Sequence, residues 1–200
     1  MKVILASQSP RRQEILRKIG IEFVVKTKNI PEDYPAEMPV EYVPIYLAQK
    51  KAAALSNEIS AEELVIAADT VVILENSVFG KDPTILGKPQ DLTEAKQMLR
   101  ALSGRSHTVI TGVCINHQGH LHTFSEKTIV FFKELTEQDI HYYVRKYKPL
   151  DKAGAYGAQE FIGMIGIERI KGCFYNVMGL PAAKLYEELK KYQLLENCVQ

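Results

Sequence analysis

The sequence predicts a mixed α/β fold in which strands and helices alternate along 200 residues. Residues 64–74 form a continuous apolar run without alternation, which is typical of a strand covered on both faces of a sheet. Residues 92–102 repeat apolar side chains at helical spacing. Two further strand-like segments flank a short turn around Gly119, which favours a hairpin in the middle of the chain. These three observations indicate a twisted mixed sheet flanked by helices.

A strand, a helix and a second strand are expected in the first thirty residues. Residues 3–6 are an apolar run typical of a short buried strand. Residues 10–19 carry apolar side chains on one helical face, with Ser9 before them as N-cap and Pro10 in the first turn, where a missing N–H is tolerated. Residues 21–27 are rich in β-branched and aromatic residues, which favours a strand.

An acidic loop with three prolines and a long helix come next. The loop carries Glu32, and two interpretations are open: a solvated connection, or a carboxylate held rigidly for a metal ion. Residues 40–58 show an apolar stripe at helical spacing. Lys51 lies on that stripe, so its side chain must either extend to solvent or meet a negative partner, such as a bound anion.

Asp69 interrupts the centre of the apolar strand at 64–74. An ionised carboxylate in such a strand is costly unless it is paired, bound to a metal or open to a cleft. A structural aspartate that caps a nearby turn is the alternative. We favour a functional carboxylate, because a group that lines a cleft is where tuned acidity is useful to an enzyme.

The second half of the chain begins with a helix, a hairpin and another helix. The apolar face of residues 92–102 predicts the first helix. Residues 106–116 and 121–132 are the expected strands of the hairpin. Thr136 is the expected N-cap of a helix over 136–147, since an acidic residue follows three positions later as in a capping box.

The remaining elements surround a glycine-rich loop at residues 151–159, which suits backbone contacts with a small ligand, although a plain structural turn is the alternative. Residues 161–170 and 173–178 are expected to be strands, and Pro181 opens a final helix. We find no internal repeat, low-complexity tract or clean interdomain linker, so a single domain spanning residues 1–200 is expected.

Composition excludes several classes of protein. The formal net charge is +1, so the chain lacks the basic surplus of a general nucleic-acid binder. No apolar run approaches the ~20 residues that a membrane span needs, and the apolar start is too short for a signal peptide. Cys114, Cys173 and Cys198 are widely spaced and odd in number, which argues against a disulfide framework and fits a reducing cytoplasm.

The histidines give only weak signals. His117, His120 and His122 cluster around the expected hairpin turn, and solvated turn residues are favoured over metal ligands there. His107 follows the helix at 92–102, and two roles are open for it, a structural one and contact with a substrate.

A candidate anion site lies between the first strand and the first helix. Ser7, Ser9, Arg11 and Arg12 gather there, beside the free N–H groups and the positive end of the helix dipole. The arginine fork suits phosphate oxygens. An ordinary capped turn with two solvated arginines is the alternative.

Six collinear motifs resemble those of the Maf family of nucleotide pyrophosphatases, from about residue 3 to residue 189. Each motif alone is weak, but six in order at the spacing of the family are specific. They are Leu-Ala-Ser-Gln-Ser-Pro-Arg-Arg (5–12), Ala-Ala-Asp-Thr (67–70), Gly-Lys-Pro (87–89), Leu-Ser-Gly-Arg-Ser-His (102–107), Asp-Lys-Ala-Gly-Ala-Tyr-Gly-Ala-Gln (151–159) and Asn-Val-Met-Gly-Leu-Pro (176–181).

The resemblance implies an elongated α/β fold related to inosine triphosphate pyrophosphatases, with two lobes around a central nucleotide cleft. Members of this family hydrolyse the α–β phosphoanhydride of a nucleoside triphosphate, which gives the monophosphate and pyrophosphate. They require a divalent cation, Mg²⁺ being expected here, with Mn²⁺ or Co²⁺ as alternatives. The loop at residues 75–84 is longer than the usual hairpin before the Gly-Lys-Pro motif.

By the same resemblance, Asp69 corresponds to the general base, and the branch of the family is the one that acts on dTTP and UTP. Gln159 offers one donor and one acceptor, which complements the O4/N3 edge of a pyrimidine. A sister branch that acts on 7-methylguanosine triphosphate has an aromatic residue, a glutamine and a glutamate at the specificity positions. The implied roles are phosphate binding for Ser7, Arg12, Lys51 and Lys88, metal binding for Glu32 and Asp69, catalysis for Asp69, Lys51 and Glu32, and base specificity for Arg11, Thr70 and Gln159.

We therefore expect a cytoplasmic house-cleaning hydrolase that removes dTTP, UTP or modified pyrimidine nucleotides. A nucleotide-binding regulator of septation without useful turnover is the alternative, and neither nucleic acid nor membrane is an expected partner. A homodimer is possible, with Tyr142, Tyr143 and Tyr147 as candidate interface residues.

Overall fold

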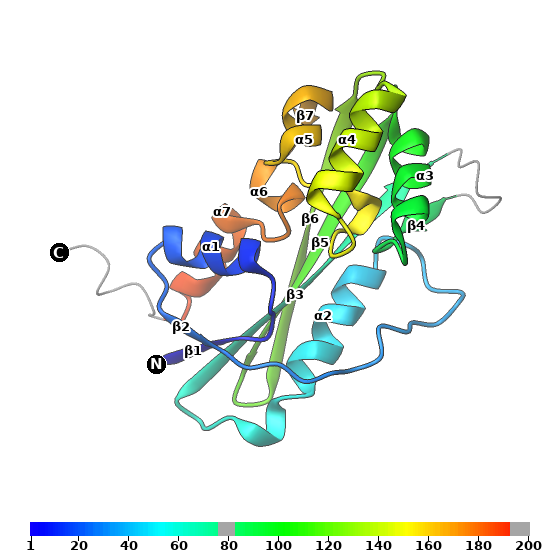
Figure 1. The fold of residues 1–200 in the computed structure, drawn as a ribbon. Helices are drawn as coiled ribbons and strands as arrows, with labels where there is room; N and C mark the ends of the chain where they lie inside the picture. Colours follow the sequence, from blue (N-terminus) through cyan, green and yellow to red (C-terminus); the bar gives the residue numbers. More distant parts are fainter. Residues whose placement is uncertain (76–82, 193–200) are drawn as a thin grey trace. The chain divides into compact units, whose positions relative to one another are not determined.

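The computed structural model describes residues 1–75 and 83–192 and confirms a mixed α/β fold (Figure 1). A seven-stranded sheet has the strand order β2-β1-β3-β5-β6-β7, and β4 pairs with β3. Strand β1 is parallel to β2 and β3, whereas the β3–β4 and β6–β7 pairs are antiparallel. The strands are β1 (Lys2–Leu5), β2 (Phe23–Val25), β3 (Glu63–Leu74), β4 (Thr84–Leu86), β5 (Ser106–His117), β6 (His120–Phe132) and β7 (Ile167–Lys171). The helices are α1 (Pro10–Lys18), α2 (Val43–Ala53), α3 (Leu92–Leu102), α4 (Glu137–Tyr147), α5 (Phe161–Gly166), α6 (Phe174–Val177) and α7 (Ala182–Lys190).

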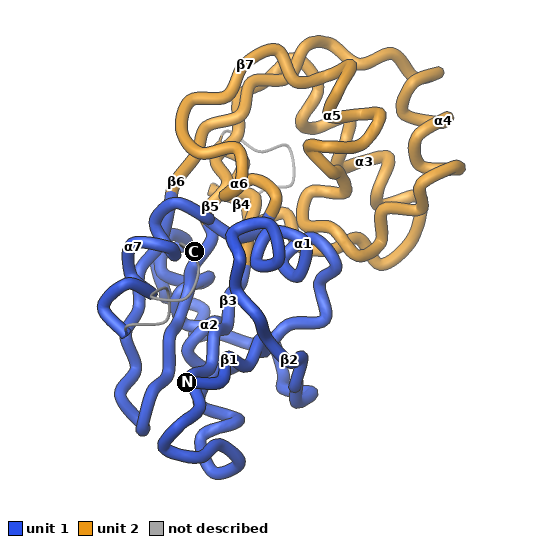
Figure 2. Tube along the Cα trace, turned by 90° about the vertical axis from the view of Figure 1, so that its left-hand side faces the viewer, with its two compact units in different colours: residues 1–69, 111–126, 179–200 blue, residues 70–110, 127–178 orange. Residues whose placement is uncertain are grey.

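The chain divides into two compact units, which Figure 2 colours separately. Unit 1 contains residues 1–69, 111–126 and 179–200, and unit 2 contains residues 70–110 and 127–178. One boundary therefore falls inside β3, directly after Asp69. Within the described ranges, no helix has the length and apolar character needed to cross a membrane.

The core of unit 1 is built from small side chains that let helix α2 lie close to the sheet. Ala48 and Ala52 of α2 pack in one cluster with Ala67 of β3 and with Ile4 of β1. Gly112 of β5 marks the closest approach, because a Cβ atom there would lie 2.4 Å from backbone atoms of both Pro44 and Ile45. The backbone of α2 therefore lies directly against Gly112, and a larger residue at this position would prevent that contact.

The core of unit 2 joins α3 and α4 to strands of the sheet. Both helices begin with a side-chain cap: the Asp91 carboxylate accepts from the backbone N–H groups of Thr93 and Glu94, and the Thr136 hydroxyl accepts from that of Asp139. The cap at Thr136 was predicted from the sequence.

Tyr143 on α4 is fully buried in this core. The prediction that Tyr143 lies at a dimer interface is therefore wrong, because a side chain without exposed surface cannot contact another copy of the chain.

Most expected elements are confirmed, although several are shorter than predicted. The helix expected at 40–58 is limited to α2, followed by one 3₁₀ turn at Ser56–Glu58. The hairpin turn consists of Gln118 and Gly119, whose φ angles of 53° and 81° are those that a tight two-residue hairpin requires. Ser9 is at the N-cap of α1, but its side chain makes no capping hydrogen bond. Most of the 75–84 loop and Cys198 lie outside the described residues.

Of the two strands predicted over 161–170 and 173–178, the first is confirmed only over residues 167–170 and the second is wrong. Residues 161–170 form helix α5 followed by the short strand β7, and residues 173–178 contain helix α6. In α5 the buried and exposed positions follow a helical period, since Ile162 is fully buried while Met164 is 71% exposed. An apolar run of this length fits either a short helix or a strand, and periodicity alone does not separate the two.

His107 is a structural residue of the unit 2 core. Its imidazole is 3% exposed, its Nε2 is 2.7 Å from the hydroxyl oxygen of Tyr156, and the rings of Phe132 and Tyr156 meet it edge-on. Burial lowers the pKa of His107 to about 3, since the charged form would lose its hydration. The imidazole is therefore neutral in the folded protein at neutral pH.

This burial predicts a loss of stability in mild acid. Below pH ~6.5 the unfolded histidine takes up a proton while the folded one does not, so the free energy of unfolding falls by up to about 1.4 kcal/mol per pH unit between pH ~6.5 and the folded pKa of about 3. At pH 5 this contribution amounts to about 2 kcal/mol of lost stability. Urea unfolding at pH 7 and pH 5 measures it.

The matched variants are His107→Gln and, at the hairpin, His117→Gln. Between pH 7 and pH 5, we expect the free energy of unfolding of His107→Gln to fall by about 2 kcal/mol less than that of the wild type. The free energy of unfolding of His117→Gln is expected to fall as much as that of the wild type. Parallel losses in the wild type and in both variants would contradict the assignment of this pH dependence to His107.

Candidate active site

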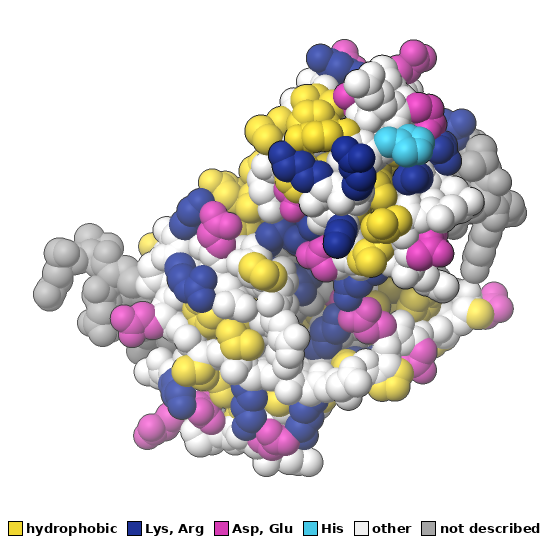
Figure 3. Space-filling view, in the orientation of Figure 1, with side chains coloured by type: hydrophobic (Ala, Val, Ile, Leu, Met, Phe, Trp, Pro, Cys, Tyr) yellow, Lys and Arg dark blue, Asp and Glu magenta, His cyan; other side chains and the backbone are white. Residues whose placement is uncertain are grey.

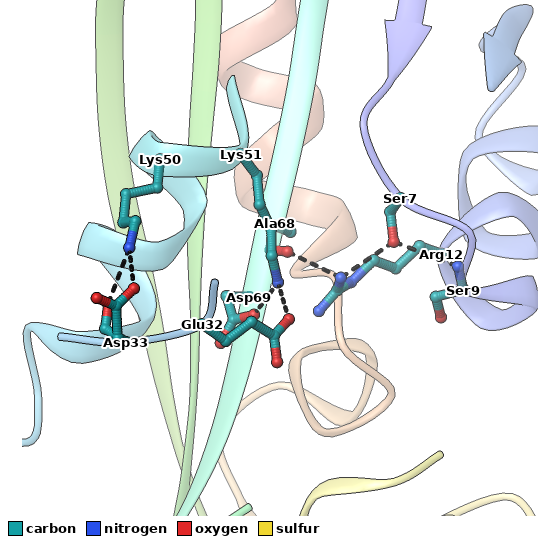
Figure 4. Close-up of polar contacts among 9 residues, drawn as sticks. All are labelled: Ser7, Ser9, Arg12, Glu32, Asp33, Lys50, Lys51, Ala68 and Asp69. Carbon is teal, nitrogen blue, oxygen red and sulfur yellow. Dashed lines mark hydrogen bonds and ion pairs between the residues drawn. The ribbon is translucent and has the colours of Figure 1, made fainter. Parts of the chain in front are cut away.

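Three of the predicted site residues meet at the ammonium group of Lys51 in unit 1 (Figure 4). Its Nζ lies 2.7 Å from Oε1 of Glu32 and forms a second ion pair with the carboxylate of Asp69. The side chains of Lys51 and Asp69 are only 17% and 12% exposed, whereas that of Glu32 is 47% exposed. Lys51 therefore meets negative partners instead of extending to solvent, and the acidic loop delivers one of them.

The secondary structure explains why these groups meet. Asp69 is at the middle of β3, and every residue from Leu64 to Asp69 is buried. Lys51 is in the last turn of α2, where the helix dipole favours a positive charge. Because the alanine-rich face of α2 packs closely on the sheet, the long Lys51 side chain reaches the carboxylate on the strand below.

Arg12 of α1 is fixed beside Asp69 by hydrogen bonds to the main chain. Its Nε donates to the carbonyl of Gly179 at 2.8 Å. Its Nη1 donates to the carbonyl of Ala68 at 2.8 Å and to Oγ of Ser7 at 3.1 Å (Figure 4). Burial lowers the pKa of the guanidinium, and the nearby Asp69 charge acts in the opposite direction. An arginine remains charged in either case, so a fixed positive group lies beside the carboxylate.

A second lysine, Lys50, holds the same acidic loop at the next position. Its Nζ donates to Oδ1 of Asp33 at 2.5 Å and to the backbone carbonyl of Asp33 at 3.0 Å. This ammonium group holds the pKa of the Asp33 carboxyl below its usual range. Lys50 was assigned no role from the sequence, because no pattern around it indicates that it meets Asp33.

The other predicted site residues are divided between the two units. Arg11 is the second residue of α1 in unit 1. Thr70, Lys88 and Gln159 belong to unit 2, in which Lys88 and Gln159 are exposed. The loops that carry Lys88 and Gln159 are connected, because the Gly154 N–H donates to the Gly87 carbonyl at 3.0 Å.

The hairpin histidines do not form a metal site with other side chains. His122 pairs with Oε2 of Glu188 at 2.7 Å, and the ring of His117 meets that of Tyr192 edge-on. Among residues 1–75 and 83–192, no group of three or more His, Cys, Asp and Glu side chains is arranged to hold a metal ion. On the face drawn in Figure 3, Lys and Arg side chains are interspersed with Asp and Glu.

A family model described as "Maf-like protein" matches residues 2–192, nearly the whole chain. The chain belongs to the Maf family. The resemblance seen in six short motifs is thus confirmed by a match along residues 2–192. Asp69, in the cluster around Lys51, belongs to one of those motifs, and the adjacent Ser7 and Arg12 belong to another.

Curated relatives extend the comparison to Maf proteins with a named activity. A protein of Phocaeicola vulgatus named dTTP/UTP pyrophosphatase is 50% identical over 191 residues, which cover 95% of each chain. One of Porphyromonas gingivalis with the same name is 51% identical over 194 residues, or 96% of this chain and 94% of that protein. The Ham1 protein of Staphylococcus aureus, a solved structure, has a TM-score of 0.49 and 16% identity, over 96% of this chain and 100% of that one.

Proposed function

We propose that this Maf-family chain is a nucleoside triphosphate pyrophosphatase that hydrolyses dTTP and UTP to the monophosphate and pyrophosphate. The observation that carries the proposal is the cluster in unit 1, in which Lys51 is held between Glu32 and Asp69 with Arg12 fixed nearby. Relatives that are about half identical over nearly their whole length bear the name of this activity, which supports the same proposal.

The residues of the cluster have separate proposed roles. Asp69 accepts the proton of the attacking water, since it is a carboxylate in a largely buried position beside two cations. Lys51, Arg12 and Ser7 are the proposed phosphate-binding residues of unit 1, and Lys88 is the proposed phosphate-binding residue of unit 2. Charge builds up on those oxygens during phosphoryl chemistry, so fixed cations stabilise the transition state most where their geometry is already set.

The residues around Lys51 fit a divalent cation such as Mg²⁺, with Mn²⁺ or Co²⁺ as alternatives. Glu32 and Asp69 are hard oxygen ligands held at one ammonium group, and Mg²⁺ is commonly bound by one or two carboxylates together with substrate phosphates. These two side chains are the proposed ligands. A cation bound there supplies positive charge that shields the phosphates and orients water.

Arg11, Thr70 and Gln159 are the proposed specificity residues. The Gln159 amide carries one donor and one acceptor, which match the N3–H and O4 edge of uracil or thymine. The cytoplasm is the proposed compartment, a choice that the free thiols of Cys114 and Cys173 support.

The test is a panel of nucleoside triphosphates with Mg²⁺, assayed separately for pyrophosphate and orthophosphate. We expect pyrophosphate as the first product from dTTP and UTP, turnover at least about tenfold faster than that of CTP or GTP, and no turnover when EDTA removes the cation. Modified pyrimidine nucleotides in the panel test the house-cleaning role. Orthophosphate as the first product, or tight binding of UTP without hydrolysis, would contradict the proposal, and the latter would favour a nucleotide-binding regulator.

A further inference from the structure

An ionic network around the buried Lys152 of unit 2 has no role in the proposed function. Lys152 is 6% exposed, and its Nζ lies 3.1 Å from Oε1 of Glu160 and 2.7 Å from Oδ1 of Asp151. The Tyr143 hydroxyl donates to the second carboxylate oxygen of Glu160. The same hydroxyl oxygen accepts the backbone N–H of Gly157 at 3.1 Å. Each oxygen of Glu160 therefore has its own donor, and one of these donors is bonded to the loop backbone.

Packing holds this carboxylate in place as well. A Cβ atom at Gly157 would lie 2.7 Å from Cδ of Glu160, so the glycine backbone rests directly on the carboxylate. The Glu160 N–H also donates to the Gly157 carbonyl at 3.0 Å, which closes a tight turn over residues 157–160. Burial raises the pKa of Tyr143 above its usual range, so the hydroxyl stays protonated at neutral pH and donates to Glu160.

Gln159 lies in this 157–160 turn, and its side chain is exposed. A glutamine amide complements uracil in one orientation and cytosine after a rotation of 180°, because the rotation exchanges its donor and its acceptor. Selection by Gln159 therefore depends on the position from which its side chain extends, because that position decides which amide orientation fits the base edge. A buried ion pair adds little stability relative to apolar residues of the same size, but it fixes geometry well.

We propose that Tyr143, Lys152 and Glu160 are positioning residues that set the base preference by fixing the 157–160 turn beneath Gln159. This inference rests on the proposed function, in particular on the role of Gln159 at the base edge. The three residues act through Gln159 and have no proposed contact with phosphate or metal.

The decisive variant is Tyr143→Phe, which removes one hydroxyl and with it the hydrogen bonds to Oε2 of Glu160 and to the Gly157 N–H. Lys152 stays paired with Oε1 of Glu160. We expect the ratio of kcat/KM for UTP to that for CTP to fall about fivefold to tenfold, mainly through a higher KM for UTP, since a base contact contributes equally to substrate and transition-state binding. Tyr142→Phe is the matched control on the same helix. Its hydroxyl accepts from Lys146 on the same helix, so the ratio for this variant is expected to stay within about twofold of the wild type.

Two further variants disturb the network without changing Tyr143, so they test the proposal even if Tyr143→Phe folds poorly. Glu160→Gln keeps the shape but removes the charge that pairs with Lys152, and Gly157→Ala displaces the carboxylate without removing any polar group. Both variants are expected to lower the ratio of kcat/KM for UTP to that for CTP, as Tyr143→Phe does. Circular dichroism with heating gives the stability of each variant, so a loss of folding is separated from a loss of preference.

Gln159→Ala distinguishes failure of the inference from failure of the function. If the wild type releases no pyrophosphate from UTP, the proposed function itself fails. If Gln159→Ala lowers the ratio but folded Tyr143→Phe, Glu160→Gln and Gly157→Ala retain it, the proposed function stands and the positioning role is overturned. If Gln159→Ala leaves the ratio unchanged, Gln159 does not select the base, and the inference is overturned with it.

Discussion

Replacing Asp69 with asparagine is expected to lower kcat for pyrophosphate release from UTP by about a thousandfold. Asparagine has the same size and keeps an oxygen for Lys51, so the fold around β3 is preserved. It cannot accept a proton from the attacking water, and it removes one of the two negative charges that are proposed to hold the cation. The measurement is the initial rate of pyrophosphate release at saturating UTP and Mg²⁺.

The control for this prediction is Asp139→Asn, the same substitution on the exposed N-terminal turn of α4, which is expected to retain activity within about twofold. Thermal unfolding of Asp69→Asn excludes misfolding as the cause of its loss. A folded Asp69→Asn enzyme with more than about a tenth of the wild-type kcat would show that another group accepts the proton.

The meeting of Asp69 with Lys51 was predictable because each residue violates a local rule. A carboxylate inside an apolar strand and a lysine on an apolar helix face each need a partner of opposite charge. The sequence places both in elements that pack together, and the structure pairs them. Residues that break a local pattern are therefore the ones for which sequence analysis predicts function most directly.

The parts of the site that were missed depend on contacts between distant segments. Nothing local to Lys50 shows that it meets Asp33, and nothing local to Glu160 shows that Tyr143 and Lys152 bind it. The error at residues 161–178 has a different cause. Short apolar runs with glycine fit a helix or a strand, and the local sequence does not separate the two.

Replacing Gly112 with alanine is expected to destabilise the protein by about 3 kcal/mol or more, with a fall of about 6–12 °C in the unfolding temperature. The new Cβ would lie 2.4 Å from backbone atoms of Pro44 and Ile45, which cannot rotate away as a side-chain end would. Helix α2 must therefore shift from the sheet, and it carries Lys51 with it, so activity is expected to fall as well. The chain contains no tryptophan, which makes circular dichroism the suitable probe of unfolding.

Gly87→Ala is the matched control, because a Cβ atom there meets nothing within 4 Å and the φ angle of Gly87 is not in the left-handed region. We expect its unfolding temperature to remain within about 2 °C of the wild type. If Gly112→Ala were as stable as Gly87→Ala, the backbone of α2 would not rest on β5 as described. The pairing of Lys51 with Asp69 would then need a different explanation, since the close approach of α2 to the sheet is what brings the ammonium group to the carboxylate.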